Sequence, residues 1–324
     1  MKLRVAVLYG GRSGEHEISL RSARAVLDAL DHDKYEVAEF LISKEGRWSP
    51  RAISPEPGAN SDIDVVIPML HGTFGEDGTV QGLLEMASLP YVGAGVMASS
   101  VCMDKEVTKR LCAERGVPIV EYVTVSSDEI GTATCDSLPF PVFVKPANLG
   151  SSVGISKAHD KAELRESLRQ AAQFDTKIIV ERGIIGRELE CAVLGNAHPE
   201  ASMPCEILPS REFYDYEDKY LLDAAETVLP ADLDARQTAE LRRLAVESYR
   251  AVGCEGMARV DFLLEQSTGK LFLNEINTIP GFTSISMYPK MWEHCGFPMP
   301  KLLDRLIELA LERHRIREGL RYSR

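Results

Sequence analysis

Short apolar runs alternate with glycine turns over the first 95 residues, and this pattern constrains the fold more than any other feature of the chain. Residues 3–9 form an apolar run that stops at Gly10-Gly11, and residues 35–42 and 64–70 predict two further strands. A helix beginning near residue 19 is predicted between the first two strands, because apolar residues recur there at helical spacing: Leu20, Ala23, Val26, Leu27 and Leu30. Strand, glycine turn, helix and strand in this order predict an open parallel α/β sheet.

Two more groups of elements follow. Residues 97–183 predict helices at 104–115 and 161–173, with strands at 119–124, 142–146 and 177–181. The remainder predicts strands at 188–194, 259–264 and 270–274, covered by helices at 235–252 and 299–314. We therefore expect a mixed α/β and α+β protein with three domains, 1–96, 97–183 and 184–324.

Charge and cysteine usage exclude several classes of protein. The net charge of −12 argues against binding to nucleic acid or to an anionic membrane, and no apolar run reaches the ~20 residues that a membrane helix needs. The seven cysteines are scattered, without C-x-x-C spacing, which favours reduced thiols over a disulfide framework or a zinc site. The chain also begins without a signal-peptide pattern, so we expect a cytoplasmic protein.

A loop rich in glycine and serine follows the strand at 142–146. It runs K-P-A-N-L-G-S-S-V-G from Lys145 to Gly154. Glycines and small hydroxyl residues let backbone N–H groups approach phosphate oxygens, and a lysine adds a point charge. The alternative is an ordinary flexible turn, but the preceding Lys-Pro and the motifs described next favour a phosphate site.

The second candidate site combines an R-x-D motif with an N-E-x-N motif. Arg259 and Asp261 lie in one apolar β run, and Glu275 and Asn277 lie in the next, so a hairpin is predicted. Glu275 and Asn277 share a strand face. Oxygen ligands converging from adjacent strands suit Mg²⁺ that bridges to nucleotide phosphates. The alternative, charges at strand ends in solvent, accounts less well for three oxygen-bearing side chains on one face.

A third motif follows the proposed metal ligands directly. Pro280-Gly281 predicts a turn. The hydroxyl groups and backbone donors beyond it, up to Ser286, are suited to hold a carboxylate.

The order of these motifs resembles the D-alanine–D-alanine ligases within the ATP-grasp enzymes. The resemblance extends from about residue 4 to 310. It rests on K-P-x-x-x-G-S-S-x-G, E-x-x-x-G-R-E, R-x-D and N-E-x-N-T-x-P-G, together with G-G-R-S-G-E-H-E-I-S, H-G-T-F-G-E-D-G-T-x-Q-G and Y-D-Y-E-D-K-Y. It implies an ATP-grasp fold with an N-terminal open parallel α/β domain, and a homodimer.

For the nucleotide, the resemblance implies that Lys105 and Lys145 hold the α- and β-phosphates and that Lys219 reaches the γ-phosphate from a closing loop. Residues from Glu181 to Ile184 would meet the adenine edge, and Glu188 would meet the ribose. Ser152 and Phe213 are further candidates for nucleotide binding. Asp261, Glu275 and Asn277 would bind two Mg²⁺ ions, or Mn²⁺ in their place.

For the amino acids, the resemblance implies that Glu15 receives the ammonium group of the first D-alanine and that His71 lies near its acyl group. Arg259 and the amide of Gly281 would stabilise the tetrahedral intermediate, and Ser286 with Met287 would hold the second carboxylate. Ser151 and Tyr220 would link to Glu15 by hydrogen bonds. The implied reaction joins two D-alanines through D-alanyl-phosphate, releases ADP and phosphate, and supplies peptidoglycan synthesis.

Several alternatives stay open. D-lactate or D-serine could be the second substrate, although Tyr220 opposes D-lactate because relatives that use it lack this tyrosine. Another ATP-grasp enzyme, such as a carboxylase, is opposed by the G-E-H-E-I-S motif, and a non-catalytic nucleotide-binding regulator by the intact metal set. Glu15 could instead favour the positive end of the following helix, and His71 could be a satisfied histidine at a strand end.

Overall fold

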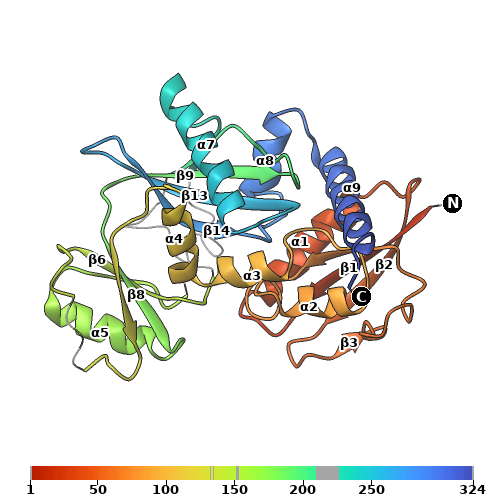
Figure 1. The fold of residues 1–324 in the computed structure, drawn as a ribbon, viewed down its shortest axis with the longest axis horizontal. Helices are drawn as coiled ribbons and strands as arrows, with labels where there is room; N and C mark the ends of the chain where they lie inside the picture. The colour runs from red at the N-terminus through yellow and green to blue at the C-terminus, as the bar shows by residue number, and fades with distance from the viewer. Residues whose placement is uncertain (1, 132, 134, 151–152, 209–225, 323–324) are drawn as a thin grey trace.

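Three β-sheets and the helices around them make up the protein (Figure 1). The computed structural model describes residues 2–131, 133, 135–150, 153–208 and 226–322. Mixed α and β elements are present throughout, as predicted.

The first sheet has the strand order β3-β2-β1-β4. Its strands are β1 (Leu3–Gly10), β2 (Tyr35–Ile42), β3 (Trp48–Ser49) and β4 (Val65–Met69). β1 pairs in parallel with both β2 and β4, so the predicted open parallel sheet is confirmed. Gly10 ends β1 with a φ of 92°, and a Cβ there would lie 2.2 Å from the carbonyl oxygen of Ile42. Only glycine allows this tight turn into the helix.

Helices cover both faces of this sheet and lead to the second one. α1 (His16–Ala29) begins three residues before the predicted start at residue 19. α2 (Thr79–Met86) and α3 (Val96–Met103) were not predicted. α4 (Lys105–Glu114) confirms the helix predicted at 104–115. Asp104 caps α4 by accepting hydrogen bonds from the amides of Glu106 and Val107, which fixes where the helix begins.

The second sheet is antiparallel, with the order β5-β8-β6-β7. Its strands are β5 (Tyr122–Ser126), β6 (Val142–Pro146), β7 (Ser156–Ala158) and β8 (Lys177–Arg182), and α5 (Lys161–Ala171) packs on it. β5 begins three residues later than the strand predicted at 119–124, because Ile119 forms an isolated bridge with Leu273 of the third sheet instead. The short β7 was not predicted.

The third sheet has the order β12-β11-β9-β13-β14, with β10 beside β9. Its strands are β9 (Gly186–Leu194), β10 (Glu200–Ala201), β11 (Cys205–Leu208), β12 (Glu226–Val228), β13 (Met257–Glu265) and β14 (Leu271–Asn277). α7 (Ala235–Ala251) packs on one face through Leu241, Leu244 and Tyr249, and α8 (Met287–His294) follows the hairpin. The strands β9, β13 and β14 and the helix α7 were predicted, whereas β10, β11, β12 and α8 were not.

The last helix is α9 (Met299–Glu318). It was expected to cover the third group of strands, and it does share a core with Leu194 and Met257 of the third sheet, but its main contacts are with β4, α1 and α8. Its apolar side, with Leu302, Leu306 and Ile307, joins a core that contains Val5 and Ile67 of the first sheet. In Figure 1 this helix lies beside the first sheet, and both ends of the chain are on that side of the molecule.

The strands of the three sheets fall within residues 3–69, 122–182 and 186–277. The predicted domain limits near residues 96 and 183 stay a prediction. Within the described part of the chain, no helix is both long and apolar enough to cross a membrane.

Candidate active site

The predicted hairpin of β13 and β14 places the proposed metal ligands together. Asp261 pairs with Glu275 and Arg259 with Asn277 across the two strands. The side-chain amide of Asn277 donates a hydrogen bond to Asp261 Oδ2 at 2.9 Å, and Arg259 donates to both Asp261 oxygens at 2.7 and 2.6 Å. Asp261 is only 8% exposed. These groups therefore form a buried cluster and are not strand-end charges in solvent.

Arg259 stays charged within this cluster. Burial alone would lower the pKa of its guanidinium, but Asp261 and Glu190 outweigh burial and raise it well above its usual value. Glu190 Oε1 lies 3.2 Å from Arg259 Nε. The cluster thus holds a permanent cation beside its carboxylates.

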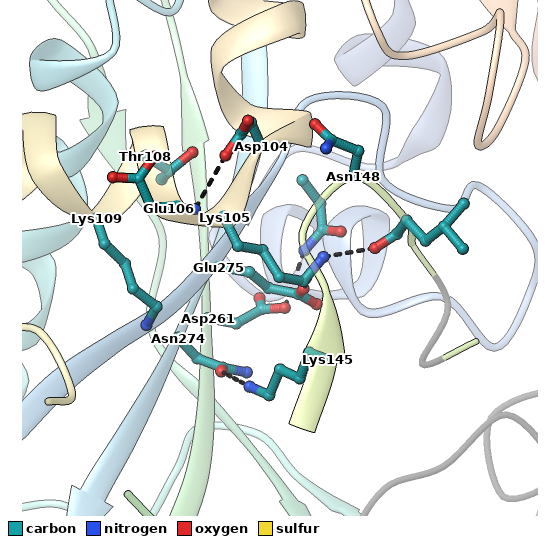
Figure 2. A network of polar contacts seen from close by, with 12 residues as sticks. Asp104, Lys105, Glu106, Thr108, Lys109, Lys145, Asn148, Asp261, Asn274 and Glu275 are labelled. Carbon is teal, nitrogen blue, oxygen red and sulfur yellow. Dashed lines mark hydrogen bonds and ion pairs between the residues drawn. The ribbon is translucent and has the colours of Figure 1, made fainter. Parts of the chain in front are cut away.

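Three lysines approach the hairpin from α4 and β6 (Figure 2). Lys105 Nζ lies 4.0 Å from Glu275 Oε2, and Lys145 donates to the side-chain oxygen of Asn274 at 3.2 Å. Lys109, one helical turn after Lys105, is fully buried. Such a concentration of cations beside carboxylates suits the binding of a polyphosphate together with a divalent metal.

Glu181 binds two of these lysines. Its carboxylate lies 2.8 Å from Lys109 Nζ and 2.6 Å from Lys145 Nζ. Burial would raise the pKa of Glu181, but the two lysines outweigh burial and lower it to about 2. Burial lowers the pKa of Lys109 despite this carboxylate, whereas Glu181 overcomes burial and raises the pKa of Lys145. Glu181 is thus a fixed, ionised acceptor.

In the described part of the chain, the largest of three cavities lined by hairpin residues has a volume of about 350 Å³, and the smallest, of about 20 Å³, is lined by Lys105 and Glu275. The largest, here called the larger cavity, lies between the second and third sheets, and the predicted nucleotide residues Lys145, Glu181, Ile184 and Glu188 line it together with Glu275. Glu188 points into this cavity region while its neighbour Arg187 pairs with Glu206 at 2.6 Å. The cavity combines an apolar part with charged groups, as expected of a nucleotide site.

The remaining cavity, of about 120 Å³ and here called the smaller cavity, lies on the other side of the hairpin and meets the first sheet. All the described residues predicted to contact the amino acids line it: Glu15, His71, Arg259, Gly281, Ser286 and Met287, with Glu275 and Asn277 of the metal set. A Cβ on Gly72 would lie 2.5 Å from Glu15 Oε2, and one on Gly281 would lie 2.7 Å from Ser286 Oγ. Glycine at both positions lets polar side chains enter the cavity.

The structure bears differently on the two alternatives kept open for Glu15 and His71, and the proposed roles of both residues stay predictions. Glu15 stands at the N-cap position of α1, but its side chain makes no capping hydrogen bond. His71 is a satisfied buried histidine and also a cavity residue: its Nδ1 lies 3.1 Å from the carbonyl of Ile279 and its Nε2 3.0 Å from Ser22 Oγ. Burial lowers the pKa of His71 to about 4, so the ring is neutral.

Glu76 is a site residue that the sequence reasoning missed. It lines the smaller cavity and accepts a hydrogen bond from the amide of Gly72 at 3.0 Å. Burial, with the nearby charge of Glu15, raises the pKa of Glu76 to about 8. The G-E-D-G run around it was the available signal. Glu190 and Lys109 were missed as well, because each stands in a strand or helix without a motif of its own.

Five predicted site residues lie outside the described residues: Ser151, Ser152, Phe213, Lys219 and Tyr220. Their roles stay predictions.

Comparison with known families agrees with this geometry. The family model "D-ala D-ala ligase C-terminus" matches residues 111–308, and "D-ala D-ala ligase N-terminus" matches residues 4–60 and 50–94. A D-alanine–D-alanine ligase from Solibacter usitatus is 68% identical and covers 100% of both chains. One from Thermoanaerobacter sp. strain X514 is 48% identical over 97% of this chain and 98% of the relative.

Solved structures give the same result. The D-alanine–D-alanine ligase from Coxiella burnetii is 40% identical, with a TM-score of 0.87 over 98% of this chain and 96% of that one. The VanG D-Ala:D-Ser ligase from Enterococcus faecalis is 35% identical, with a TM-score of 0.88 over 96% of this chain and 100% of that one. The predicted ATP-grasp fold is confirmed. Sequence motifs, cavity lining and full-length similarity together establish that the chain belongs to the D-alanine–D-alanine ligase family of ATP-grasp enzymes.

Proposed function

We propose that the chain joins two D-alanine molecules into D-alanyl-D-alanine at the expense of ATP. The observation that carries this proposal is that Glu275 lines both the larger and the smaller cavity. A carboxylate in the smaller cavity and the terminal phosphate of a nucleotide in the larger one would meet at the hairpin. Phosphoryl transfer to a carboxylate requires this juxtaposition, because its catalysis is mainly positioning and charge neutralisation.

The larger cavity is proposed to hold ATP. Lys105 and Lys145 would neutralise the α- and β-phosphates, and Glu188 would meet the ribose. The ionised carboxylate of Glu181 and the chain up to Ile184 would meet the adenine edge. Ser152, Phe213 and Lys219 are assigned to the nucleotide on family resemblance.

Asp261, Glu275 and Asn277 are proposed to hold two Mg²⁺ ions, with Mn²⁺ as a substitute. The donor set fits a hard cation, since two carboxylates and an amide oxygen meet beside Lys105 and Arg259. Within the described ranges no three His, Cys, Asp or Glu side chains form a metal cluster, so phosphate oxygens and water would supply the remaining ligands, as is usual for Mg²⁺. When bound, the ions neutralise phosphate charge.

The smaller cavity is proposed to hold both amino acids. Glu15 would accept a hydrogen bond from the ammonium group of the first D-alanine. The carboxylate of this D-alanine would attack the γ-phosphorus of ATP, which releases ADP and forms D-alanyl-phosphate. The neutral amine of the second D-alanine then attacks the acyl carbon, the bond from that carbon to the phosphate oxygen breaks, and phosphate leaves as the nitrogen loses a proton to solvent. The Arg259 guanidinium, which stays charged, and the Gly281 amide would stabilise the oxyanion, while Ser286 would hold the second carboxylate. Ser151 and Tyr220 would close the site around Glu15.

A cytoplasmic location and a homodimer complete the proposal. All seven cysteines are free thiols in the structure, which suits a reducing compartment. The dimer rests on family resemblance, and light scattering of the purified chain tests it.

The test of the function is phosphate release with ATP, Mg²⁺ and a panel of D-alanine, D-serine and D-lactate, with products identified by mass. We expect phosphate release that depends on D-alanine and a product with the mass of the D-alanine dipeptide. Preferential formation of D-alanyl-D-serine or D-alanyl-D-lactate would assign a different second substrate. A rate of ATP hydrolysis that does not depend on D-alanine would contradict the proposal.

A further inference from the structure

His71 uses both ring nitrogens for bonds within the protein. A backbone carbonyl can only accept, so Nδ1 carries the proton and donates to Ile279 O at 3.1 Å. The ring is neutral, so Nε2 has a free lone pair and accepts from the hydroxyl of Ser22 at 3.0 Å. Neither nitrogen is left for the substrate in this arrangement, although the ring lines the smaller cavity.

Ser22 joins this histidine to the loop after β14. Its side chain is 0% exposed on α1, two turns after Glu15. Its Oγ donates to His71 and also accepts from the amide of Phe282 at 3.3 Å. Phe282 directly follows Gly281, whose amide is the proposed oxyanion donor. One hydroxyl therefore connects three segments that line the smaller cavity: α1, the turn after β4 that carries His71, and residues 279–281.

We propose that Ser22 is a positioning residue for the amino-acid half of the reaction: its hydroxyl locks the ring of His71 and the amide of Phe282 together, and so fixes the direction of the Gly281 amide in the smaller cavity. Ser22 itself does not line that cavity, so it acts through its neighbours and not on the substrate. The larger cavity is built from other segments. Loss of the hydroxyl thus affects the use of D-alanine and leaves ATP binding in place.

The chain offers a matched control one turn earlier on the same helix. Ser19 is equally buried, accepts from the amide of Gly10 at 2.7 Å and donates to the carbonyl of Met69. Like Ser22, it therefore bonds two neighbouring segments, in this case through two backbone groups. Among the described residues, its side-chain hydrogen bonds reach neither His71 nor residues 279–282. Ser19→Ala thus reports what the loss of a buried hydroxyl does to α1 alone.

The experiment compares steady-state kinetics of the full chain with Ser22→Ala, Ser22→Cys and Ser19→Ala, varying D-alanine and ATP separately. Ser22→Ala should lower kcat/KM for D-alanine about ten- to a hundred-fold, the effect of an unpaired buried partner, and change KM for ATP less than about twofold. Ser22→Cys, which keeps a weak donor of similar size, should recover part of the loss. Ser19→Ala should leave kcat/KM for D-alanine near that of wild type in the folded fraction.

The inference rests on the proposed function, and the two fail in different ways. A wild-type chain without D-alanine-dependent phosphate release contradicts the proposed function. An active wild type with Ser22→Ala within about twofold of it, or with equal losses for D-alanine and ATP, overturns the role of Ser22. A loss in Ser19→Ala as large as in Ser22→Ala also overturns it. If Ser22→Ala does not fold, Ser22→Cys decides: unchanged kcat/KM for D-alanine overturns the role, and a selective loss supports it.

Discussion

At the scale of single residues, the balance between burial and neighbouring charges decides which side chains of the site stay ionised. Glu181 stays ionised because two lysines hold it, whereas burial, with a contribution from Glu15, raises the pKa of Glu76 to about 8. Two carboxylates beside one hairpin thus differ in protonation at neutral pH. This separation lets a strongly anionic ligand approach a site rich in acidic residues.

Substitution of Lys145 should weaken the binding of ATP and not that of D-alanine. In Lys145→Ala, KM for ATP should rise about ten-fold or more, because a buried cation that is proposed to face the phosphates is lost, while KM for D-alanine should stay within about twofold. The control is Lys161→Ala, since Lys161 is an exposed lysine on α5 that pairs with Asp136. Initial rates with each substrate varied in turn check this. Equal changes in both KM values would indicate a structural role for Lys145.

Glu275→Gln should abolish turnover in a folded protein. The substitution keeps the size of the side chain but removes one of the two carboxylate charges at the proposed metal site. Glu265→Gln is the matched control at the opposite end of the same hairpin, where the carboxylate pairs with Arg182 at 2.8 Å, and it should keep most of the activity. Phosphate release and circular dichroism measure the two effects. Near-normal turnover of Glu275→Gln would contradict the proposal that Glu275 binds Mg²⁺.

His71 should make the protein less stable in mild acid. Its folded pKa of about 4 lies below the ordinary 6.5, so the folded chain binds fewer protons than the unfolded chain between these pH values. The free energy of unfolding should therefore fall by about 3 kcal/mol from this residue as pH drops from 6.5 to 4. Urea unfolding of wild type and His71→Gln across this range isolates the contribution. Parallel curves for the two proteins would refute it, and His32→Gln, at an exposed position, serves as the unaffected control.

At the scale of elements, patterns with a clear period were predictable. α7 and the hairpin of β13 and β14 follow apolar spacing closely, and the convergence of Asp261, Glu275 and Asn277 came from strand geometry alone. α3 carries the sequence V-M-A-S-S-V-C-M, which has no polar face and so gives no helical period. β10 and β12 have two and three residues, too few to show alternation. Lys109 was missed because tertiary packing buries it and no local pattern records that, whereas the signal for Glu76, the G-E-D-G run, was present in the sequence.

The start of α4 ties an element to the site. Asp104→Ala removes the cap of α4 and should cost about 1 kcal/mol of stability. It should also raise KM for ATP, because Lys105 is the first residue of that helix. Asp160→Ala removes a similar cap from α5, where Asp160 accepts from the amides of Ala162 and Glu163 at 2.8 and 2.9 Å. Asp160→Ala should lower the stability by a similar amount without changing KM for ATP. Thermal unfolding and KM for ATP are measured on both variants. If KM for ATP were the same in Asp104→Ala as in Asp160→Ala, the cap of α4 would have no role in ATP binding.

At the scale of the whole molecule, α9 joins the two ends of the chain in one core. Leu302, Leu306 and Ile307 pack with Val5 and Ile67, and Arg313 donates from the same helix to the carbonyl of Tyr91 at 2.8 Å. The first sheet is therefore completed by the last helix. The smaller cavity depends on this sheet, because Glu15 and His71 follow its strands.

Leu306→Ala should lower the free energy of unfolding by about 2–5 kcal/mol, the usual cost of a large-to-small change in a core. Ile316→Ala, on the same helix but 61% exposed, should change it by less than about 0.5 kcal/mol. Denaturant unfolding followed by tryptophan fluorescence measures both, since Trp292 of α8 belongs to the same core. A similar stability for Leu306→Ala and wild type would show that α9 contributes little to this core.

The packing of α9 against the first sheet also has a consequence during translation. Residues 3–69 leave the ribosome well before residues 302–310, which cover part of the sheet side formed by Val5, Val7 and Ile67. A nascent chain therefore carries an incompletely covered β-sheet until residues 302–310 are made. Exposed apolar sheet surface is where incomplete chains aggregate. Chains that stop before residue 299 should consequently need chaperones, even though every residue proposed to carry chemistry has already been synthesised.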